Sequence, residues 1–280
     1  MKSVHCHLSP VTSLLLVGCG NMGGALLERW KQSSAASRID IIDPTHRQKN
    51  ESAICWHANL ESLPVDYAPQ VIILAVKPQQ LAEILPSYKI RFGSAPLYIS
   101  IAAGKTLAFY KQHLGEHAHV VRAMPNTPAL IAQGMSVLCA SATLPASARK
   151  IATDLLQAVG KVEWIEDEAQ MDAVTAISGC GPAYVFLFLE SLVAAAVQAG
   201  LSEPLARTLA LQTISGSTAL AAQSGKNFQH LRVDVASPGG ATEAALAVLM
   251  QGDAMKALIG EAVMAAEKRS HTLSATAEPH

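Results

Sequence analysis

The pattern of hydrophobic positions changes near residue 168. Before it, short apolar runs recur with helical patterns between them, and each run ends at polar, glycine or proline residues. Such runs are typical of buried strands in a parallel sheet. Strands are expected at Leu14–Val17, Ile39–Ile42, Val71–Val76, Leu97–Ile101 and Val120–Met124, with Met135–Cys139 and Lys161–Trp164 as edge strands.

The last third of the chain has a helical pattern throughout. Its long alanine-rich segments carry apolar residues at helical spacing. Helices are expected over Ala183–Ala199, Glu203–Ser224, Thr242–Met250 and Met255–Lys268. The chain is therefore predicted to hold an α/β domain with a mostly parallel, doubly wound sheet over residues 1–168. An all-α domain follows over residues 169–280, and residues 1–12 and 271–280 are expected to be loose ends.

Composition narrows the class of protein. Of 280 residues, 50% are hydrophobic and 15% charged, so part of the surface is expected to be buried against another copy. The net charge of −1 offers no basic face for nucleic acid. The five cysteines form no C-x-x-C pair, which favours reduced thiols in a cytoplasm.

Two membrane interpretations are considered and set aside. Leu16–Cys19 resembles a lipoprotein cleavage box, but the apolar run before it is too short, and a buried first strand is favoured. Ala183–Ala199 has the length of a marginal span, yet Glu190 lies in its middle. We therefore expect a helix buried in an oligomer rather than in a membrane.

A glycine turn follows the first expected strand. It reads Gly18-Cys19-Gly20-Asn21-Met22-Gly23, which is G-x-G-x-x-G between a strand and a helix. That context indicates a Rossmann-type dinucleotide site, with the pyrophosphate over the turn and the start of the helix. Gly18 permits the tight turn, Gly20 lets the pyrophosphate approach, and Gly23 lets the helix pack closely.

The ends of other strands offer further cofactor contacts. Asp43 ends the second strand, where a carboxylate accepts ribose hydroxyls and favours NAD, whereas Arg47 with Thr45 favours a 2′-phosphate and NADP. The sequence does not decide between them, and Asp43 is also a candidate turn cap. The turns expected to run under the nicotinamide ribose are Ala75-Val76-Lys77-Pro78 and Ala102-Ala103-Gly104.

A second turn suited to an anion lies far along the chain. It reads Ser237-Pro238-Gly239-Gly240-Ala241-Thr242 and opens an expected helix, whose first N–H groups and dipole suit a carboxylate or phosphate. Two such turns in two differently built halves indicate two ligands brought together. A capped helix start is the plainer alternative for this turn.

Together the motifs resemble the pyrroline-5-carboxylate reductase family over about Leu14–Lys268. The motifs that carry the resemblance are Val76-Lys77-Pro78, Ser100–Gly104, Arg122–Pro128, Asp172–Thr175, Ser178–Tyr184 and Ser237–Thr242, in that order. The resemblance implies a Rossmann domain followed by an all-helical dimerisation domain. It implies NADPH- or NADH-dependent reduction of 1-pyrroline-5-carboxylate to L-proline, the last step of proline biosynthesis, by a homodimer or a larger homo-oligomer.

The resemblance also implies residue roles. The Ser237–Thr242 turn would hold the substrate carboxylate, Thr242 would hydrogen-bond the ring nitrogen, Glu168 would contact ligand, and Asn59 would lie near the adenosine ribose. Cys180 and Phe228 depart from the usual serine and proline of the family. No metal is expected, because His113, His117 and His119 fall in a connection interrupted by Gly115.

Two other functions are weighed. A related imine or hydroxy-acid reductase would carry a catalytic lysine in the helical half, but Lys226, Lys256 and Lys268 lie in no glycine-rich helix start. A nucleotide-binding protein without turnover would have no need of the second turn. Both alternatives are less consistent with the motifs than the reductase.

Overall fold

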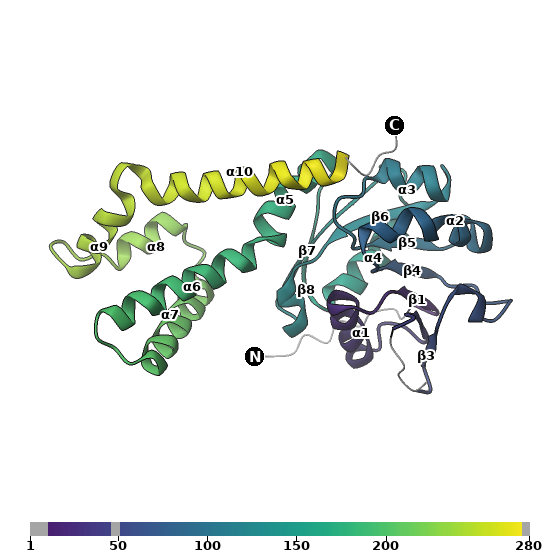
Figure 1. The fold of residues 1–280 in the computed structure, drawn as a ribbon, viewed down its shortest axis with the longest axis horizontal. Helices are drawn as coiled ribbons and strands as arrows, with labels where there is room; N and C mark the ends of the chain where they lie inside the picture. The colour runs from purple at the N-terminus through teal and green to yellow at the C-terminus, as the bar shows by residue number, and fades with distance from the viewer. Residues whose placement is uncertain (1–10, 46–50, 276–280) are drawn as a thin grey trace. The chain divides into compact units, whose positions relative to one another are not determined.

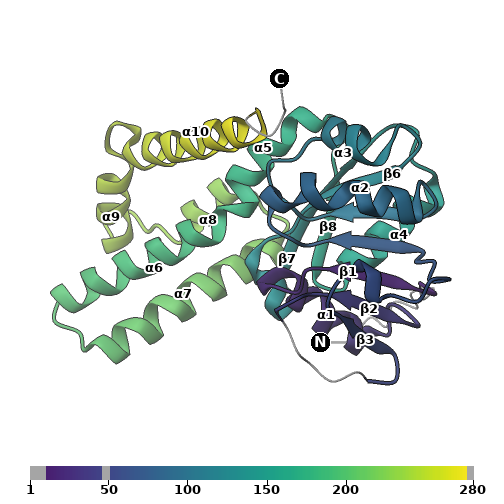
Figure 2. The ribbon, with the colours of Figure 1, turned by 45° about the vertical axis from the view of Figure 1, so that its right-hand side comes forward.

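The computed structural model describes residues 11–45 and 51–275. They fall into two compact units. The sheet unit comprises Met1–Cys180 with Ala266–His280, and the helical unit comprises Gly181–Ala265. Figures 1 and 2 show the mixed sheet and its flanking helices in one unit and helices alone in the other.

The sheet unit is built on one eight-stranded sheet in the order β3-β2-β1-β4-β5-β6-β7-β8. Neighbouring strands are parallel except β6 and β7, which are antiparallel. The strands are β1 (Leu14–Val17), β2 (Ile39–Ile42), β3 (Ile54–His57), β4 (Val71–Leu74), β5 (Leu97–Ser100), β6 (His119–Met124), β7 (Gly134–Ala140) and β8 (Gly160–Trp164). The strand order reverses between β1 and β4, and ligands of such sheets bind at that point, beyond the carboxyl ends of the strands.

Helices cover both faces of this sheet. The covering helices are α1 (Asn21–Ser33), α2 (Leu81–Phe92), α3 (Leu107–Leu114) and α4 (Ala146–Gln157), and the unit also contains the short α5 (Met171–Val174) and the end of α10 (Ala254–Ala275). Leu14 and Leu16 of β1 belong to a core with α1 and α4, while Leu15 and Val17 belong to a second core with α2 and α3. The alternation along one strand thus fills both layers.

Most expected strands are confirmed, with three differences. β3 was not expected, and β7 lies between β6 and β8 rather than at the edge of the sheet. β7 reaches this inner place because it folds back antiparallel on β6 and then pairs in parallel with β8. β4 ends at Leu74, so the next three residues belong to the turn and not to the strand.

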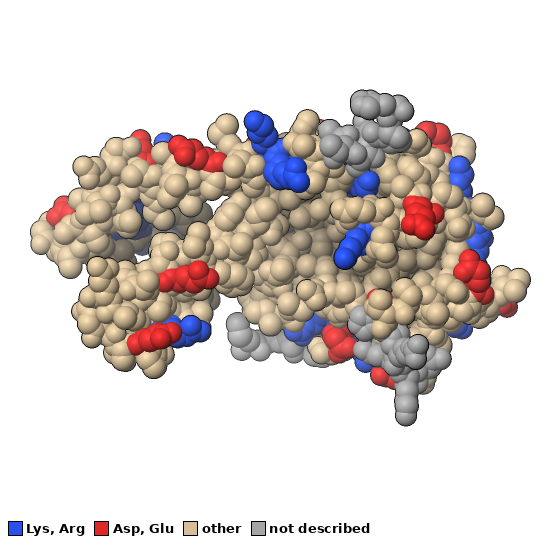
Figure 3. Space-filling view, in the orientation of Figure 1, with Lys and Arg blue, Asp and Glu red and all other residues tan. Residues whose placement is uncertain are grey.

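The helical unit has almost no core of its own. Its helices are α6 (Gly181–Gln198), α7 (Glu203–Ser224), α8 (Phe228–Asp234), α9 (Ala241–Met250) and most of α10, and α6 packs against α7. Of residues 181–265, all of them described, only Ala206 and Ala210 are buried. The stretch Glu168–Gln198 is long and apolar enough, by length and composition alone, to cross a membrane. Figure 3 shows few charged side chains over these helices on the visible face.

The described ends of the chain are more ordered than expected. The Val11 side chain is buried, and its N–H donates to the Ala35 carbonyl at 3.0 Å. α10 continues to Ala275, inside the segment expected to be a loose tail. The Ser270 hydroxyl donates to Asp172 Oδ1 at 2.6 Å, which fixes the last turns of α10 to α5.

Candidate active site

The first glycine turn depends on two crowded glycines and one open glycine. Gly18 has a φ of +87°, and a Cβ there would lie 2.9 Å from the Ala75 carbonyl oxygen. A Cβ at Gly23 would lie 2.5 Å from the Gly18 carbonyl oxygen, whereas one at Gly20 would meet nothing within 4 Å. The turn therefore needs Gly18 and Gly23 for its own geometry, and Gly20 leaves space over the backbone.

The start of α1 is suited to a phosphate. Gly20 is the N-cap residue, no side chain caps the helix, and its first turn contains no acidic residue. The first N–H groups of a helix have no carbonyl partner within the helix, and the dipole adds partial positive charge. A pyrophosphate over Gly20 fits these donors, so the residues present match the dinucleotide expected from the sequence.

Asp43, at the end of β2, faces the glycine turn. Its Oδ2 accepts the Cys19 N–H at 2.8 Å, and its Oδ1 accepts the Thr45 N–H at 2.9 Å and the Thr45 hydroxyl at 2.7 Å. The Asp43 side chain thus links β2 to the turn between β1 and α1. Asp43 belongs to the wall of the neighbouring pocket as well.

A pocket of about 610 Å³ lies at the carboxyl ends of β1, β2 and β4. Of the expected cofactor residues, those that line it are Gly18, Cys19, Gly20, Asp43, Thr45, Asn59, Ala75, Val76 and Lys77. Polar and aromatic residues absent from the expected set also line it, namely Glu61, Gln80, Glu83, Ser87 and Tyr88. The sequence contains a signal for two of them. Leu81 and Leu85 lie on the buried side of α2, and helical spacing places Glu83 and Ser87 on another side.

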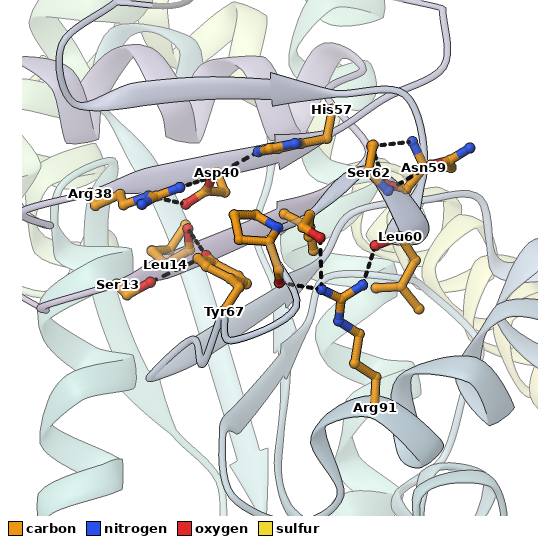
Figure 4. Close-up of polar contacts among 12 residues, drawn as sticks. Ser13, Leu14, Arg38, Asp40, His57, Asn59, Leu60, Ser62, Tyr67 and Arg91 are labelled. Atoms are coloured by element: carbon orange, nitrogen blue, oxygen red, sulfur yellow. Dashed lines mark hydrogen bonds and ion pairs between the residues drawn. The ribbon is translucent and has the colours of Figure 1, made fainter.

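Hydrogen bonds fix the outer wall of this pocket (Figure 4). Asn59 Oδ1 accepts the Ser62 N–H at 3.0 Å, so the amide nitrogen of Asn59 is the group that can still donate to a ligand. The Arg91 guanidinium donates to the carbonyls of Leu60, Leu63 and Pro64, which follow Asn59 in the chain. Arg91 therefore holds the segment that carries Asn59.

A buried carboxylate supports the strand before this wall. Asp40 on β2 is fully buried, and its oxygens accept the Arg38 Nε at 2.7 Å and contact His57 Nε2 at 2.8 Å. His57 is the last residue of β3, two positions before Asn59. The cluster joins β2 and β3 at the side of the sheet where Asn59 lies.

Other expected cofactor residues do not line the pocket. Asn21, Met22 and Gly23 form the first turn of α1, and Pro78 follows the lining residue Lys77. Nor does Ala102–Gly104 line the pocket; the Ala102 N–H donates to Ser100 Oγ at 3.3 Å, and a Cβ at Gly104 would lie 3.5 Å from Leu273. Arg47 lies outside the described residues. The roles of these residues toward a cofactor stay predictions.

The thiol inside the glycine turn is shielded. Cys19 is 7% exposed, and burial, followed by the nearby Asp43 carboxylate, raises its pKa from 9.0 to about 11. The thiol is therefore neutral at physiological pH and adds no negative charge beside a phosphate. This keeps the turn electrostatically compatible with an anionic ligand.

The second turn already holds a carboxylate of the chain. Gly239 has a φ of +71°, and its N–H donates to Glu243 Oε2 at 2.6 Å. The Gly240 N–H donates to the Ser237 carbonyl at 2.9 Å, which closes the turn. Ala241 and Thr242 begin α9, where their N–H groups have no carbonyl partner within the helix. The contact of Glu243 was missed, although an acidic residue three positions after an N-cap is a known capping spacing.

The two residues that depart from the usual family pattern, Phe228 and Cys180, adopt ordinary local structure. Phe228 is the first residue of α8, follows the capping residue Asn227, and is 79% exposed. The Cys180 N–H donates to the Thr175 carbonyl at 2.9 Å and ends the turn before α6. Neither departure from the expected pattern disrupts an element.

Glu168 has two partners within the sheet unit. Its Oε1 accepts the Leu107 N–H at 2.7 Å and forms an ion pair with Arg122, whose side chain is 8% exposed. Thr106, Asp172 and His271 line the adjoining cavity of about 320 Å³ together with this pair. Glu168 thus joins the start of α3 to β6, and its expected contact with substrate stays a prediction.

The histidines of the α3–β6 connection have separate places. His113 is in α3, where its Nδ1 contacts the Phe109 carbonyl at 2.8 Å, and His119 begins β6. Within residues 11–45 and 51–275, no three His, Cys, Asp or Glu side chains gather as a metal site.

The fold and the first turn define a dinucleotide-binding α/β protein. In agreement, residues 13–104 match the family described as NADP oxidoreductase, coenzyme F420-dependent. Residues 168–273 match the pyrroline-5-carboxylate reductase dimerisation family. The chain belongs to the pyrroline-5-carboxylate reductase family, a family of NAD(P)-dependent oxidoreductases.

Relatives and solved structures match this chain over most of its length. Pyrroline-5-carboxylate reductase of Pseudomonas aeruginosa is 39% identical over 267 residues, covering 93% of this chain and 96% of the relative. The structure from Coxiella burnetii is 31% identical with a TM-score of 0.87, over 94% of this chain and 99% of that one. The Plasmodium falciparum structure, with NADP bound, is 32% identical with a TM-score of 0.82, over 95% and 99%.

Proposed function

We propose that this chain reduces the C=N bond of 1-pyrroline-5-carboxylate to give L-proline, with NADPH or NADH as hydride donor. The observation that carries the proposal is the 39% identity to a pyrroline-5-carboxylate reductase over nearly the whole chain. The presence of both glycine turns in their expected contexts supports it. The reaction is the last step of proline biosynthesis.

The cofactor would occupy the pocket beyond β1 and β4. The Gly18–Gly23 turn and the first turn of α1 would hold the pyrophosphate, and Asn59 with Lys77 would contact the ribose or its phosphate. Bound there, the reduced nicotinamide supplies the hydride. The residues of this chain bind, orient and shield the reactants.

The substrate carboxylate would bind the Ser237–Thr242 turn. The N–H groups of Gly239, Ala241 and Thr242 are suited to a carboxylate, and Gly239 already donates to one, that of Glu243. The Thr242 hydroxyl, in the first turn of α9, would hydrogen-bond the ring nitrogen and fix the orientation of the imine. Such a carboxylate clamp leaves the C=N carbon free to accept hydride.

We further propose that the protein is a cytoplasmic homodimer formed through residues 169–280. Such dimers could assemble into a larger homo-oligomer. The apolar residues of α6, none of them buried within one chain, would pack against a second subunit rather than lipid. Residues 1–168 would bind cofactor. This division is the one expected from the sequence.

The activity is tested with purified protein and both reduced cofactors. We expect oxidation of NADPH or NADH only when 1-pyrroline-5-carboxylate is added, with L-proline formed in equal amount. Rates measured side by side with the two cofactors give the preference. A folded protein that binds cofactor but forms no L-proline would exclude the proposed reaction.

A further inference from the structure

The hydrogen-bond capacity of Asp43 is nearly used up within the protein. An ionised carboxylate has about four acceptor positions, two on each oxygen. The two contacts of Thr45 fall on Oδ1 and that of the Cys19 N–H on Oδ2, and Asp43 is 8% exposed. Oδ1 therefore already accepts two hydrogen bonds from Thr45, and Oδ2 accepts at least the one from Cys19.

This arrangement is unsuited to hydrogen bonding with both hydroxyls of the adenosine ribose. A carboxylate that accepts both adjacent hydroxyls of the adenosine ribose needs an unused position on each oxygen. Oδ1 has none while Thr45 stays in place. The Asp43 carboxylate thus accepts hydrogen bonds from the protein itself, although it lies at the end of β2, where dinucleotide-binding proteins place the residue that binds ribose.

The same contacts give Asp43 a different task. The Cys19 N–H lies between Gly18, which has a positive φ, and Gly20, which leaves open space for a phosphate. The Gly18 N–H is held in turn by the Ile42 carbonyl at 2.9 Å. Two successive amides of the turn are thus fixed to the end of β2, one by a backbone carbonyl and one by the Asp43 carboxylate.

We propose that Asp43 is a positioning residue of the glycine turn and that it does not select between NADH and NADPH. The inference rests on the proposed binding of a nicotinamide dinucleotide in this pocket. NADH and NADPH share the pyrophosphate that the turn would hold and differ only at the adenosine ribose. A residue that acts through the turn therefore affects both cofactors equally, whereas a ribose acceptor favours NADH and repels the 2′-phosphate.

Asp43→Asn separates the two roles. The amide of asparagine keeps one oxygen acceptor, but its NH2 group faces a donor, either the Cys19 N–H or the groups of Thr45. The turn therefore loses a charge-assisted hydrogen bond. We expect the Kd values of NADH and NADPH, measured by calorimetry, to rise together by about tenfold, with their ratio unchanged within about twofold. Asp43→Ala, which adds no donor, is the second variant and carries the same expectations if Asp43→Asn does not fold.

Hydrogen exchange in the cofactor-free protein gives an independent reading. The Cys19 amide is expected to exchange about tenfold faster in Asp43→Asn than in the wild type, because its acceptor is lost. Glu61→Gln removes a negative charge from the same pocket wall and should leave Cys19 exchange unchanged. This control separates the loss of the hydrogen bond to the Cys19 N–H from the loss of a negative charge in the pocket.

Three results would overturn the inference. One is a change of more than about threefold in the NADPH to NADH preference of Asp43→Asn, which is expected of a ribose acceptor and not of a turn support. Another is unchanged exchange at Cys19. A wild-type protein that binds neither cofactor would overturn the proposed function and the inference with it, whereas the first two results leave the proposed function intact.

Discussion

The Gly239 N–H donates to the carboxylate of Glu243 at 2.6 Å, four residues further on in α9. The turn proposed to bind the substrate carboxylate therefore binds one of the chain's own. Binding of substrate at Gly239 would displace Glu243 from this N–H. The two carboxylates compete for one donor, and the competition can be measured.

Glu243→Ala is expected to lower the KM for 1-pyrroline-5-carboxylate by about threefold to tenfold. The reason is that substrate no longer has to displace the Glu243 carboxylate from the Gly239 N–H. The KM for NADPH should not change. Glu203→Ala, which removes an acidic residue from the first turn of α7, is the matched control. Steady-state kinetics decide the matter, and a raised substrate KM would mean that Glu243 helps to hold the substrate.

Thr242→Val should keep the fold and the affinity for cofactor but lower kcat by about tenfold or more. Valine has nearly the shape of threonine and lacks the hydroxyl that would orient the ring nitrogen. The measurement is kcat with saturating NADPH and substrate, alongside the Kd for NADPH. Thr242→Ser, which retains a hydroxyl, should recover most of the activity; wild-type turnover in the valine variant would remove Thr242 from the mechanism.

Gly20→Ala and Gly23→Ala should separate binding from stability. A Cβ at Gly20 meets nothing within 4 Å, so this variant should unfold like the wild type yet bind NADPH at least about tenfold more weakly. A Cβ at Gly23 lies 2.5 Å from the Gly18 carbonyl oxygen, so that variant should lose about 1–3 kcal/mol of stability. Urea unfolding and calorimetric titration test the pair, and equal losses of stability in both would contradict the assignment.

Glu168→Gln should act on stability. The change removes the negative charge opposite Arg122, whose side chain is 8% exposed, and leaves that guanidinium facing a neutral amide. We expect a loss of about 2 kcal/mol, discounted because Glu168 is itself 29% exposed. Unfolding midpoints measure this loss. A stable variant with a raised substrate KM would instead support the contact with ligand expected from the sequence.

Alkaline pH should destabilise the sheet unit through two buried thiols. Burial raises the pKa of Cys19 and of Cys139 from 9.0 to about 11. Because the pKa of each thiol is higher in the folded state than in the unfolded state, the neutral thiol contributes fully to the stability of the fold below pH 9. This contribution is lost as the pH rises toward 11. Thermal midpoints should therefore fall above pH 9.

Variants test the assignment of this alkaline loss. Cys139→Ala is less stable at neutral pH because it leaves a cavity, but its slope between pH 9 and 10 should be shallower than that of the wild type. The buried tyrosines, whose pKa values burial raises from 10.0, are present in both proteins and add equally to the two slopes, so they do not affect the comparison. Cys55→Ala serves as the thiol control, and an unchanged slope in Cys139→Ala would contradict the prediction.

The periodic parts of the fold were predictable. The expected bounds of β1, β2 and α7 agree with the structure, because their apolar runs have clear turn residues at both ends. β3 was missed because Ile54-Cys55-Trp56-His57 is short and mixes apolar and polar residues. The segment is a strand because it pairs with β2. α8 was missed because its start depends on the Asn227 side chain, which accepts the His230 N–H at 2.8 Å.

The candidate site was predictable where one local motif defines it. The glycine turn between β1 and α1 could be found because its spacing and context are both local. The contact between Asp43 and the Cys19 N–H could not, because it joins positions 24 apart and depends on the direction of one side chain. The same holds for the partners of Glu168, which come from α3 and β6.

The nearly empty interior of the helical unit has a thermodynamic consequence. With only Ala206 and Ala210 buried in residues 181–265, a lone subunit has little apolar burial to offset the conformational entropy that these helices lose on folding. In the proposed dimer, the missing burial is shared between subunits, and the unfolding equilibrium then includes a dissociation step. By mass action, the temperature at which this unit melts would fall on dilution, so its stability is a property of the subunit concentration as much as of the sequence.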